Sequence, residues 1–523
     1  MIRFLLPLLL VLASPLAAAQ PGAPDATFAG NGVFSYQAPN TGASRVLVRP
    51  DGRILLIGVV QGNAAVLSLR ADGTVDTAYG TDGVAAFPDS RAYRAQGATL
   101  LADGSLVLSG ARVDDDDTIQ AGVLLKLSAS GAPEATFGTG GIVELEAEEG
   151  FDQSLFVAVR ELTDGSLATG GTYAASDGEG GGGVLSARFT RTGALDASYG
   201  TGGVIRTPSS SGLVAFGGVY DANGALTLTG GVAVPDGLFE LDGALARVLP
   251  DGTLDASFGA DGVTTFSTGF PFVLMTDARV DAEGRTVAVG ISADLFAGAS
   301  EALVVRFLAD GTLDATFAEN GIFRSTLGAA IAQTTAVAIQ NDGKVLFSGT
   351  VGTLIAPEAF VGRLTTGGQL DVAFGTNGVS RVAAGTPAVG AGLALQADGR
   401  ILVAGQRGNG ESDPTGIVAA RLLNDDVDTA AEPPARSGPL ALRLAGPNPF
   451  AERTTLALDA AAPLAVHVAA YDVLGREVAT LHDGPLAAGR TVLAFDASGL
   501  SPGTYLIRAT AGGASATLAV VRR

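Results

Sequence analysis

Seven acidic residues recur along this chain in one short motif, and they are the first candidates for chemistry. The motif is acid-x-Ser/Thr/Ala-aromatic-Gly/Ala-x-x-Gly-Val/Ile, and its acids are Asp25, Asp76, Glu134, Asp196, Asp255, Asp314 and Asp371. A carboxylate placed so can accept hydrogen bonds from backbone N–H groups two or three residues further on and so fix a turn. Because seven equivalent copies contain no singular member, we predict that all seven are structural, and we assign no catalytic residue.

The remaining composition excludes most catalytic and metal chemistry. There is no Cys, and the two His, His467 and His482, lie near the C-terminus, so thiolate chemistry, Cys-ligated metals and a Ser-His-Asp triad in the repeats are excluded. The run Asp114 to Asp117 could bind Ca²⁺ through oxygen ligands. Its spacing matches no calcium loop, so a solvated acidic loop is the favoured interpretation, and no metal or cofactor is assigned. The net charge of −21 excludes a nucleic-acid partner.

The motif recurs at a period that defines the architecture. Its aromatic residues are 51, 58, 62, 59, 59 and 57 residues apart, and they are Phe28, Tyr79, Phe137, Tyr199, Phe258, Phe317 and Phe374. Between them stands a second motif, acid or Asn, then Gly, then an alternating apolar run, with turn glycines at Gly52, Gly104, Gly165, Gly224, Gly284, Gly343 and Gly399. Asp-Gly between apolar runs indicates a β-hairpin.

Each repeat contains four expected strands, which in the second copy are residues 84–87, 98–102, 105–112 and 122–128. Seven repeats of four strands predict an all-β protein with a seven-bladed β-propeller. The alternative is a linear β-solenoid, which more often uses simpler repeats and atypical terminal units. In the propeller the first strand, from Val33, and the last strand, 417–423, would complete one ring.

The pairing of these two motifs at this spacing resembles the bacterial delta-60 repeat family. The similarity covers residues 25 to about 423. It implies repeated β-structure in an exported or surface protein and brings no catalytic residues.

The sequence divides into a secretory signal, a propeller, a linker and a small C-terminal domain. Residues 1–19 combine a short positive start, an apolar stretch and a small-residue site before Gln20, which predicts a secretory signal. The propeller is expected over residues 20–424, a linker over 425–438 and a β-sandwich of seven short strands over 439–523. No later apolar run is long enough for a transmembrane segment in the mature chain.

The C-terminal segment resembles the sorting domain of type IX secretion substrates. The similarity rests on GPNPF (446–450), YDVLGREV (471–478), GPLAAGR (484–490) and LSPGTYLIR (500–508). It implies the type IX secretion machinery as a partner and a secreted or outer-membrane-surface location. In that family the domain is commonly cleaved after export.

The loops that differ between repeats are the expected binding surface, because loops carry function while a scaffold repeats. In a propeller these loops share one face, opposite the uniform turns, and their acids predict an acidic face. The candidate binding residues are Tyr93, Asp114, Asp115, Asp116, Asp117, Phe151, Phe239, Phe270 and Phe272. The aromatic side chains could stack on sugar rings or contact a protein partner.

A basic residue stands eight positions before the motif acid in five repeats. The pairs are Lys126–Glu134, Arg188–Asp196, Arg247–Asp255, Arg306–Asp314 and Arg363–Asp371, and they predict ion pairs. Arg421 has no acid eight residues later, and Asp25 has no preceding strand. Ring closure would therefore pair Arg421 with Asp25.

Two functional hypotheses follow from these patterns. The first is a non-enzymatic exported protein that binds a glycan, a surface polymer or another protein through its variable loops. The alternative is a glycan-acting hydrolase or lyase that uses carboxylates near the propeller axis. The absence of any singular acid–base pair favours the first.

Overall fold

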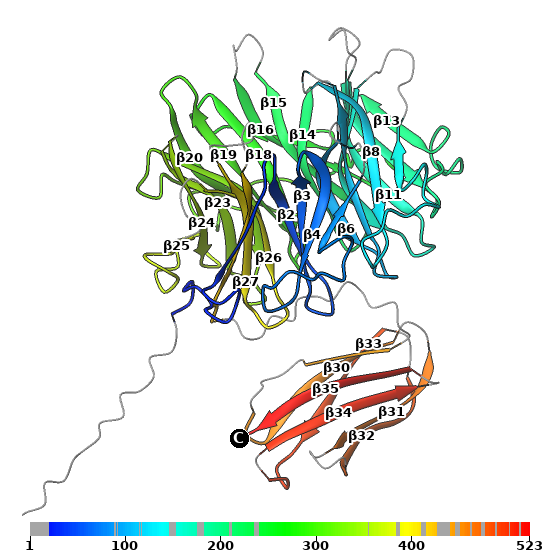
Figure 1. Cartoon of the computed structure of the whole chain (residues 1–523). Coiled ribbons are helices and arrows are strands. Elements are labelled where there is room, and N and C mark those ends of the chain that lie inside the picture. Colours follow the sequence, from blue (N-terminus) through cyan, green and yellow to red (C-terminus); the bar gives the residue numbers. More distant parts are fainter. Residues whose placement is uncertain are drawn as a thin grey trace, which may run out of the picture. The chain divides into compact units, whose positions relative to one another are not determined.

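A computed structural model of the chain describes residues 20–425 and 440–523, apart from some short segments. These segments are 88–89, 91–92, 115, 117, 146–152, 175–181, 209–211, 235–239, 354, 383–387, 409–414, 445–449, 461–462, 472–475, 487–488, 502 and 512–513. The chain divides into two compact units, Met1–Ala431 and Glu432–Arg523. All the elements assigned in the described residues are strands (Figure 1), so the predicted all-β fold is confirmed.

The first unit contains seven four-stranded antiparallel groups around one axis, here called sheets 1 to 7, and a single parallel bridge between Leu241 and Phe272 joins sheets 4 and 5. In each sheet the first-named strand lies innermost. Sheet 1 contains β2 (Gly42–Val48), β3 (Ile54–Val60), β4 (Asn63–Leu69) and β5 (Val84–Ala86), and sheet 2 contains β6 (Tyr93–Leu100), β7 (Leu106–Val113), β8 (Ile119–Leu127) and β9 (Ile142–Glu144). Sheet 3 contains β10 (Gln153–Glu161), β11 (Leu167–Ala174), β12 (Gly182–Phe189) and β13 (Val204–Pro208), and sheet 4 contains β14 (Leu213–Tyr220), β15 (Leu226–Ala233), β16 (Leu241–Val248) and β17 (Val263–Phe266).

The remaining sheets continue the ring. Sheet 5 contains β18 (Phe272–Val280), β19 (Thr286–Asp294), β20 (Ala299–Phe307) and β21 (Ile322–Ser325), and sheet 6 contains β22 (Ile331–Ile339), β23 (Val345–Thr353), β24 (Ala356–Leu364) and β25 (Val379–Arg381). Sheet 7 contains β26 (Ala388–Leu395), β27 (Ile401–Arg407), β28 (Gly416–Leu422) and β1 (Val33–Gln37). Neighbouring inner strands contact one another all the way round, including β26 with β2, so the ring is closed.

The N-terminal strand closes this ring. Strand β1 pairs antiparallel with β28, with Val33 opposite Ala420 and Gln37 opposite Gly416. Each sequence repeat is therefore offset from its sheet by one strand: residues 84–86 pair with β4 of the preceding repeat. The reason is local, because the connection that contains the motif acid is hydrogen-bonded to the preceding strand: the Asp76 N–H donates to the Ser68 carbonyl and the Ser68 N–H to the Gly83 carbonyl, both at 2.9 Å. The chain therefore returns beside the strand it has just left.

The topology gives the propeller two different faces. Turns between the first and second strands and between the third and fourth strands of each sheet lie on one face, here called the repeat face. Loops between the second and third strands, and the connections between sheets, lie on the other, here called the variable face. All antiparallel hairpins alternate in this way, and the lower side of the propeller in Figure 1 is the repeat face.

The motif aromatics pack the sheets together on the repeat-face side. Phe28, Phe137, Phe258, Phe317 and Phe374 are fully buried, and each ring lies against a turn of the next sheet. A Cβ built on Gly73 would come 2.7 Å from the Phe28 ring, so only glycine fits there. The residue after the aromatic also donates its N–H across the same boundary, as from Ala29 to the Asp72 carbonyl at 2.8 Å.

The second unit is a small β-sandwich, as predicted. One sheet contains β29 (Leu440–Leu444), β30 (Arg453–Ala460) and β33 (Gly489–Asp496). The other contains β32 (Glu477–Leu486), β31 (Leu464–Tyr471), β34 (Gly503–Ala511) and β35 (Ala514–Arg522). Its core includes Phe450, Phe495 and Tyr505, whose rings contact one another edge to face.

Candidate binding face and the structural repeat face

The motif acids organise the turns of the repeat face. In Asp25, one carboxylate oxygen accepts hydrogen bonds from the Thr27 N–H at 3.0 Å and the Thr27 hydroxyl at 2.7 Å. Asp196, Asp255 and Asp314 make the same two bonds with Ser198, Ser257 and Thr316. Asp371 keeps only the backbone bond, because Ala373 has no hydroxyl.

The basic residue of the third strand lies over the motif aromatic of its own sheet. The distance from the cationic group to the ring centroid is between 4.5 and 5.7 Å in six sheets, for Lys126, Arg188, Arg247, Arg306, Arg363 and Arg421. This geometry allows a cation–π interaction in each sheet. Sequence reasoning predicted the charge at this position but not its contact with the ring.

The predicted ion pairs form in three of the five internal repeats. Nitrogen–oxygen distances are 2.5 Å for Arg247–Asp255, 2.8 Å for Arg306–Asp314 and 2.9 Å for Arg363–Asp371. The predictions for Lys126–Glu134 and Arg188–Asp196 are wrong, since neither is among the ion pairs found within 4.0 Å in the described residues. Glu134 accepts a hydrogen bond from the Thr136 hydroxyl at 3.1 Å, as Asp25 does from Thr27, and both cations lie over the ring of their motif aromatic.

A second basic position, which sequence reasoning missed, supplies further ion pairs. It is the residue after Asp-Gly in the hairpin motif. Arg53 lies 3.3 Å from Asp76, Lys344 3.3 Å from Asp371 and Arg400 2.7 Å from Asp25. In sheet 1 the third strand carries Ser68 instead of a cation, and Arg53 forms the ion pair with the motif acid Asp76 in its place. The recurrence of Arg or Lys after Asp-Gly was the available signal.

The first and last segments of the propeller meet through the same kind of ion pair as the internal repeats. The Arg421 Nε lies 2.8 Å from the Asp25 Oδ2, and the same guanidinium donates to the Thr27 hydroxyl at 2.9 Å and the Ala71 carbonyl at 2.5 Å. Arg421 thus connects sheet 7 to sheet 1. The geometry is that of the internal pairs, although 396 positions separate the two residues.

The last described residues of the propeller, Asn424 and Asp425, are bound to sheet 6. Arg363, whose side chain is fully buried, donates through its Nη2 to the Asp425 carboxylate at 3.0 Å and through its Nη1 to the Asn424 side chain at 2.8 Å. In other sheets the arginine at the equivalent position donates a hydrogen bond to a carbonyl in a turn of the next sheet, as Arg306 does to the Thr366 carbonyl. At sheet 7 that turn is divided between the two chain ends, and Asp425 takes the place of the carbonyl.

Stability should therefore fall at acidic pH. In Asp25, Asp314 and Asp371 burial raises the pKa of the carboxyl, but hydrogen bonds to the carboxylate and the charges of nearby Arg and Lys side chains together lower it by more. In Asp196 and Asp255 the hydrogen bond from the serine hydroxyl is the largest effect, and it lowers the pKa. All five have a lowered pKa, so their contribution is present above the ordinary value of 3.8 and is lost as pH falls below it. We expect thermal melting to be flat from about pH 5 to 7 and to drop steeply below about pH 4. In Asp255→Asn the drop should be smaller, and an identical acid profile would contradict this origin.

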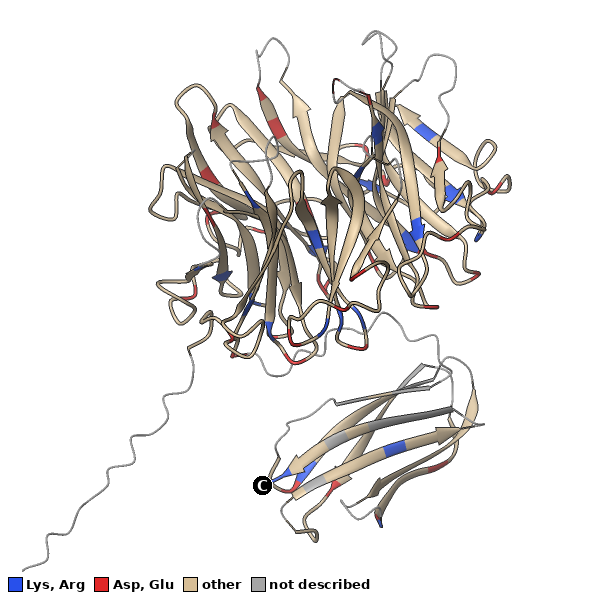
Figure 2. Cartoon of the chain, viewed as in Figure 1, with Lys and Arg blue, Asp and Glu red and all other residues tan. Residues whose placement is uncertain are grey.

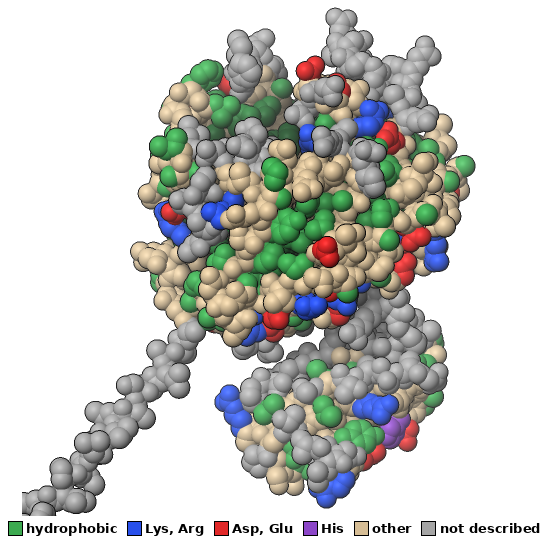
Figure 3. Space-filling view, in the orientation of Figure 1, with side chains coloured by type: hydrophobic (Ala, Val, Ile, Leu, Met, Phe, Trp, Pro, Cys, Tyr) green, Lys and Arg blue, Asp and Glu red, His purple; other side chains and the backbone are tan. Residues whose placement is uncertain are grey.

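The motif acids of the repeat face and their basic partners are thus engaged within the scaffold. Figure 2 shows acidic and basic residues together at the lower ends of the strands, and Figure 3 shows them along the lower rim of the propeller. These acids stay structural in our interpretation, because each described motif acid except Glu134 binds backbone groups or a cation of the repeat face.

On the variable face, Tyr93 belongs to a polar cluster of sheet 2. Its hydroxyl donates to Glu144 at 2.6 Å, and the Arg112 Nε lies 2.9 Å from the other oxygen of Glu144. Burial and the contact with Glu144 raise the pKa of Tyr93 to about 12. The phenol therefore stays protonated at neutral pH and can act as a hydrogen-bond donor rather than as a base.

The acidic run beside this cluster is partly described. Asp114 Oδ1 accepts the N–H groups of Asp116 and Thr118 at 3.0 and 2.9 Å, and its other oxygen accepts from Gln120. Asp115, Asp117, Phe151 and Phe239 lie outside the described residues. In the part of the chain that the structure covers, no group of three or more ligating side chains could hold a metal ion.

Among the described residues, the most exposed apolar side chains of the variable face are ones that sequence reasoning did not select. Phe296 is 84% exposed and Ile355 is 87% exposed, and they stand at the loops between the second and third strands of sheets 5 and 6, with Leu295 beside Phe296. The predicted binding residues Phe270 and Phe272 are half-buried and so are less exposed than Phe296 and Ile355. A solitary Phe in a variable loop gives no periodic signal, so its exposure could not be inferred.

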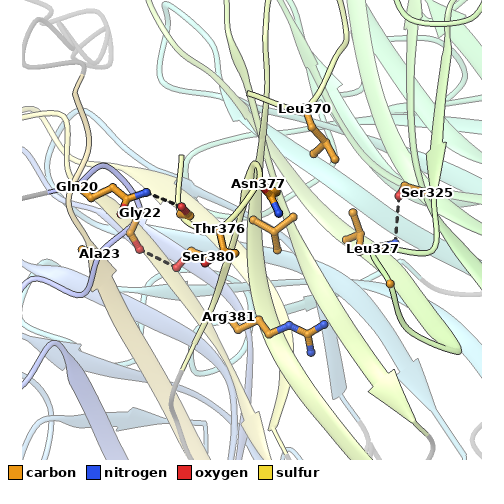
Figure 4. Close-up of a pocket in the computed structure, with 13 residues that line it drawn as sticks. Gln20, Gly22, Ala23, Ser325, Leu327, Leu370, Thr376, Asn377, Ser380 and Arg381 are labelled. Atoms are coloured by element: carbon orange, nitrogen blue, oxygen red, sulfur yellow. Dashed lines mark hydrogen bonds between the residues drawn. The ribbon is translucent and has the colours of Figure 1, made fainter. Parts of the chain in front are cut away.

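A separate pocket of about 750 Å³ lies beside the N-terminal residues (Figure 4). Its wall is held by hydrogen bonds from Gln20 to the Gly375 carbonyl at 2.5 Å and from Ser380 to the Gly22 carbonyl at 2.6 Å. Its one ionisable lining residue, Arg381, is paired with Glu358 at 2.8 Å. The pocket is a consequence of ring closure and contains no acid–base pair.

Comparisons with known families agree with this architecture. The model of a domain of unknown function (DUF5122) β-propeller, which corresponds to the delta-60 repeats, matches residues 237–258, 282–317 and 396–426. The model of a secretion system C-terminal sorting domain matches residues 446–522. The chain thus carries delta-60 propeller repeats followed by a type IX sorting domain, and the sorting domain makes it a secreted or outer-membrane-surface protein that interacts with the secretion machinery.

Comparisons with individual proteins add only distant similarity. No curated protein is significantly similar. Similar solved structures include a fungal alcohol oxidase of the AA5 family in complex with copper (12% identity, 94% of this chain and 98% of that one, TM-score 0.40). Others are the polysaccharide lyase Uly1 (11%, 73% and 90%, 0.42) and a gluconolactonase from Xanthomonas campestris (15%, 62% and 88%, 0.32). No helix in the described residues is long and apolar enough to cross a bilayer.

Proposed function

We propose that this protein is a non-enzymatic binding module of the cell exterior, with the variable face as its binding surface. The observation that carries the proposal is the contrast between the two faces. The motif acids of the repeat face and their basic partners are engaged in turns and ion pairs, whereas Leu295, Phe296 and Ile355 on two neighbouring sheets of the variable face are largely solvent-exposed. Exposed apolar side chains on neighbouring sheets, as here on sheets 5 and 6, are typical of interaction surfaces.

The Tyr93 cluster supports binding rather than hydrolysis or elimination. A glycan-acting enzyme needs a carboxylate or phenolate available as a base. Glu144 is hydrogen-bonded by Tyr93 and paired with Arg112, and the raised pKa of Tyr93 keeps its proton in place. A polar cluster of this kind can donate and accept hydrogen bonds with sugar hydroxyls.

The test combines a glycan-array screen with a polysaccharide-degradation assay on the same purified protein. We expect binding without degradation, and a loss of at least about tenfold in affinity for the double variant Phe296→Ser, Ile355→Ser, as for removing apolar hot spots. The matched control is Val372→Ser, which removes an apolar side chain that is 73% exposed on the repeat face. Degradation of any glycan, or equal losses in both variants, would contradict the proposal.

A further inference from the structure

The inner strands surround the propeller axis and share one irregularity. Each has a bulge at the same place, and the bulged residues are Ser44, Gln96, Val157, Phe216, Thr276, Thr335 and Ala391. The residue after the bulge lies against the next inner strand: a Cβ on Gly97 would be 2.5 Å from the Val157 carbonyl oxygen. Five sheets accordingly have Gly or Ala there, at Gly97, Ala158, Gly217, Ala336 and Gly392.

The two other sheets carry opposite charges at this crowded position. They are Arg45 of sheet 1 and Asp277 of sheet 5, which stand on opposite sides of the ring. The Arg45 Nη1 lies 3.8 Å from the Asp277 Oδ1, and the Arg45 Nε donates to the Gln96 carbonyl of sheet 2. Arg45 therefore extends across the axis.

The charges of this cluster do not balance. Asp277, which is 2% exposed, accepts Arg279 Nη1 at 2.8 Å on one oxygen and the Val337 N–H at 3.1 Å on the other. Its charge and its acceptor oxygens are thus already used. Arg45 is left with one hydrogen bond and a distant ion pair, although its side chain is only 24% exposed.

A guanidinium in this situation favours binding an anion. Taking a charge out of water is costly unless it is paired and hydrogen-bonded. Burial lowers the pKa of Arg45, with Asp277 opposing and Arg279 adding to the shift. The described inner strands carry four cations and two acids, Arg45, Arg94, Arg160, Arg279, Glu161 and Asp277, within a chain of net charge −21.

An apolar wall lies beside the cluster. Phe216 and Val214 on inner strand β14 are 39% and 49% exposed. Because the inner strands face the propeller axis, we infer that solvent reaches them along the axis, and we call this space the axial channel. Gly217, next to Phe216, lies so close to the Thr276 carbonyl that a Cβ would be 2.2 Å away. Thr276 immediately precedes Asp277, so the wall and the charged cluster occupy contacting segments of sheets 4 and 5.

We propose that the axial channel binds a small organic carboxylate. Its carboxylate accepts hydrogen bonds from the free N–H groups of Arg45, in the forked geometry that guanidinium offers, and its ring or apolar part packs on Phe216. The site is separate from the variable-face loops of sheets 5 and 6, so each can be tested independently of the other.

The experiment is calorimetric titration of the purified protein with benzoate and D-glucuronate, with glucose and inorganic sulfate as comparisons. We expect at least one carboxylate to bind, glucose not to bind and sulfate to bind more weakly. Arg45→Gln should weaken carboxylate binding by at least about tenfold, and Phe216→Ala by about threefold or more. Arg191→Gln, which alters an exposed turn residue of the repeat face, should bind as the unmodified protein does.

Melting curves of the unliganded variants distinguish this role from a structural ion pair. Arg45→Gln should melt at the same or a higher temperature than the unmodified protein, because it removes an unbalanced charge. The proposal would be overturned if neither carboxylate binds, if Arg45→Gln binds them unchanged, or if sulfate binds as tightly and Phe216→Ala has no effect. Should Arg45→Gln fail to fold, Phe216→Ala decides the outcome.

Discussion

Reversing the charge of Asp25 should destabilise the propeller more than any other single substitution at the closure. Asp25 is buried and pairs with both Arg421 and Arg400. Removing one partner of a buried ion pair costs about 3–5 kcal/mol, and Asp25→Arg adds repulsion to that loss. We expect a large decrease in the free energy of unfolding, measured by denaturant titration, with partial recovery in Asp25→Arg, Arg421→Asp. The recovery is partial because Arg400 loses Asp25 and keeps only its pair with Asp398.

The matched control is the internal pair, Asp314→Arg with Arg306→Asp, which lies within one sheet. Both reversals should destabilise, but only Asp25→Arg should release β1. Hydrogen exchange at Val33–Gln37 should therefore become fast in Asp25→Arg and stay slow in Asp314→Arg. Equal protection of β1 in both variants would show that the Asp25 pair does not hold the ring closed.

Deleting residues 20–37 should have the second large effect. The deletion removes β1, the Asp25 carboxylate and the Phe28 ring, and it leaves the edge of β28 unpaired. Exposed edge strands pair with other chains. We expect melting to fall by at least about 10 °C and oligomers to appear in size-exclusion chromatography.

A synthetic peptide of residues 20–37 added in trans provides the check. Because the deleted strand binds along an existing edge, the peptide should raise the melting temperature of the shortened protein and reduce its oligomers. A peptide with Phe28→Ala and Asp25→Ala should do so much less. A shortened protein that melts as the full chain does would refute closure by the N-terminal strand.

The sequence repeat made the propeller fold predictable. The two residues that lack a partner within their own repeat predicted how the ring closes. Seven copies at a near-constant spacing determine the number of sheets, and the unpaired Arg421 and Asp25 identify the contact between the chain ends. The offset of one strand between repeat and sheet was not predicted, because strand pairing depends on the hydrogen bonds of the connection that contains the motif acid rather than on motif boundaries. The absence of the Lys126–Glu134 and Arg188–Asp196 ion pairs was not predicted either, since a spacing of eight positions does not fix whether the cation reaches the carboxylate or only the ring.

The functional candidates were less predictable because they do not repeat. Arg45 and Asp277 come from different repeats at a position that is otherwise Gly or Ala, and only the closed ring brings them together. Phe296 stands in a variable loop where nothing in the sequence distinguishes an exposed ring from a buried one. Tyr93 was predicted as a loop aromatic, whereas it begins strand β6, and its contact with Glu144 depends on the order of strands across sheet 2.

The central claim is that the variable face binds while the repeat face holds the scaffold together. Hydrogen–deuterium exchange with the tightest-binding glycan from the array, compared with the unliganded protein, tests it most directly. We expect new protection in the loops that carry Phe296 and Ile355, with turns of the repeat face unchanged. Protection confined to the repeat-face turns, or an array without any bound glycan and no protection by a protein partner, would contradict it.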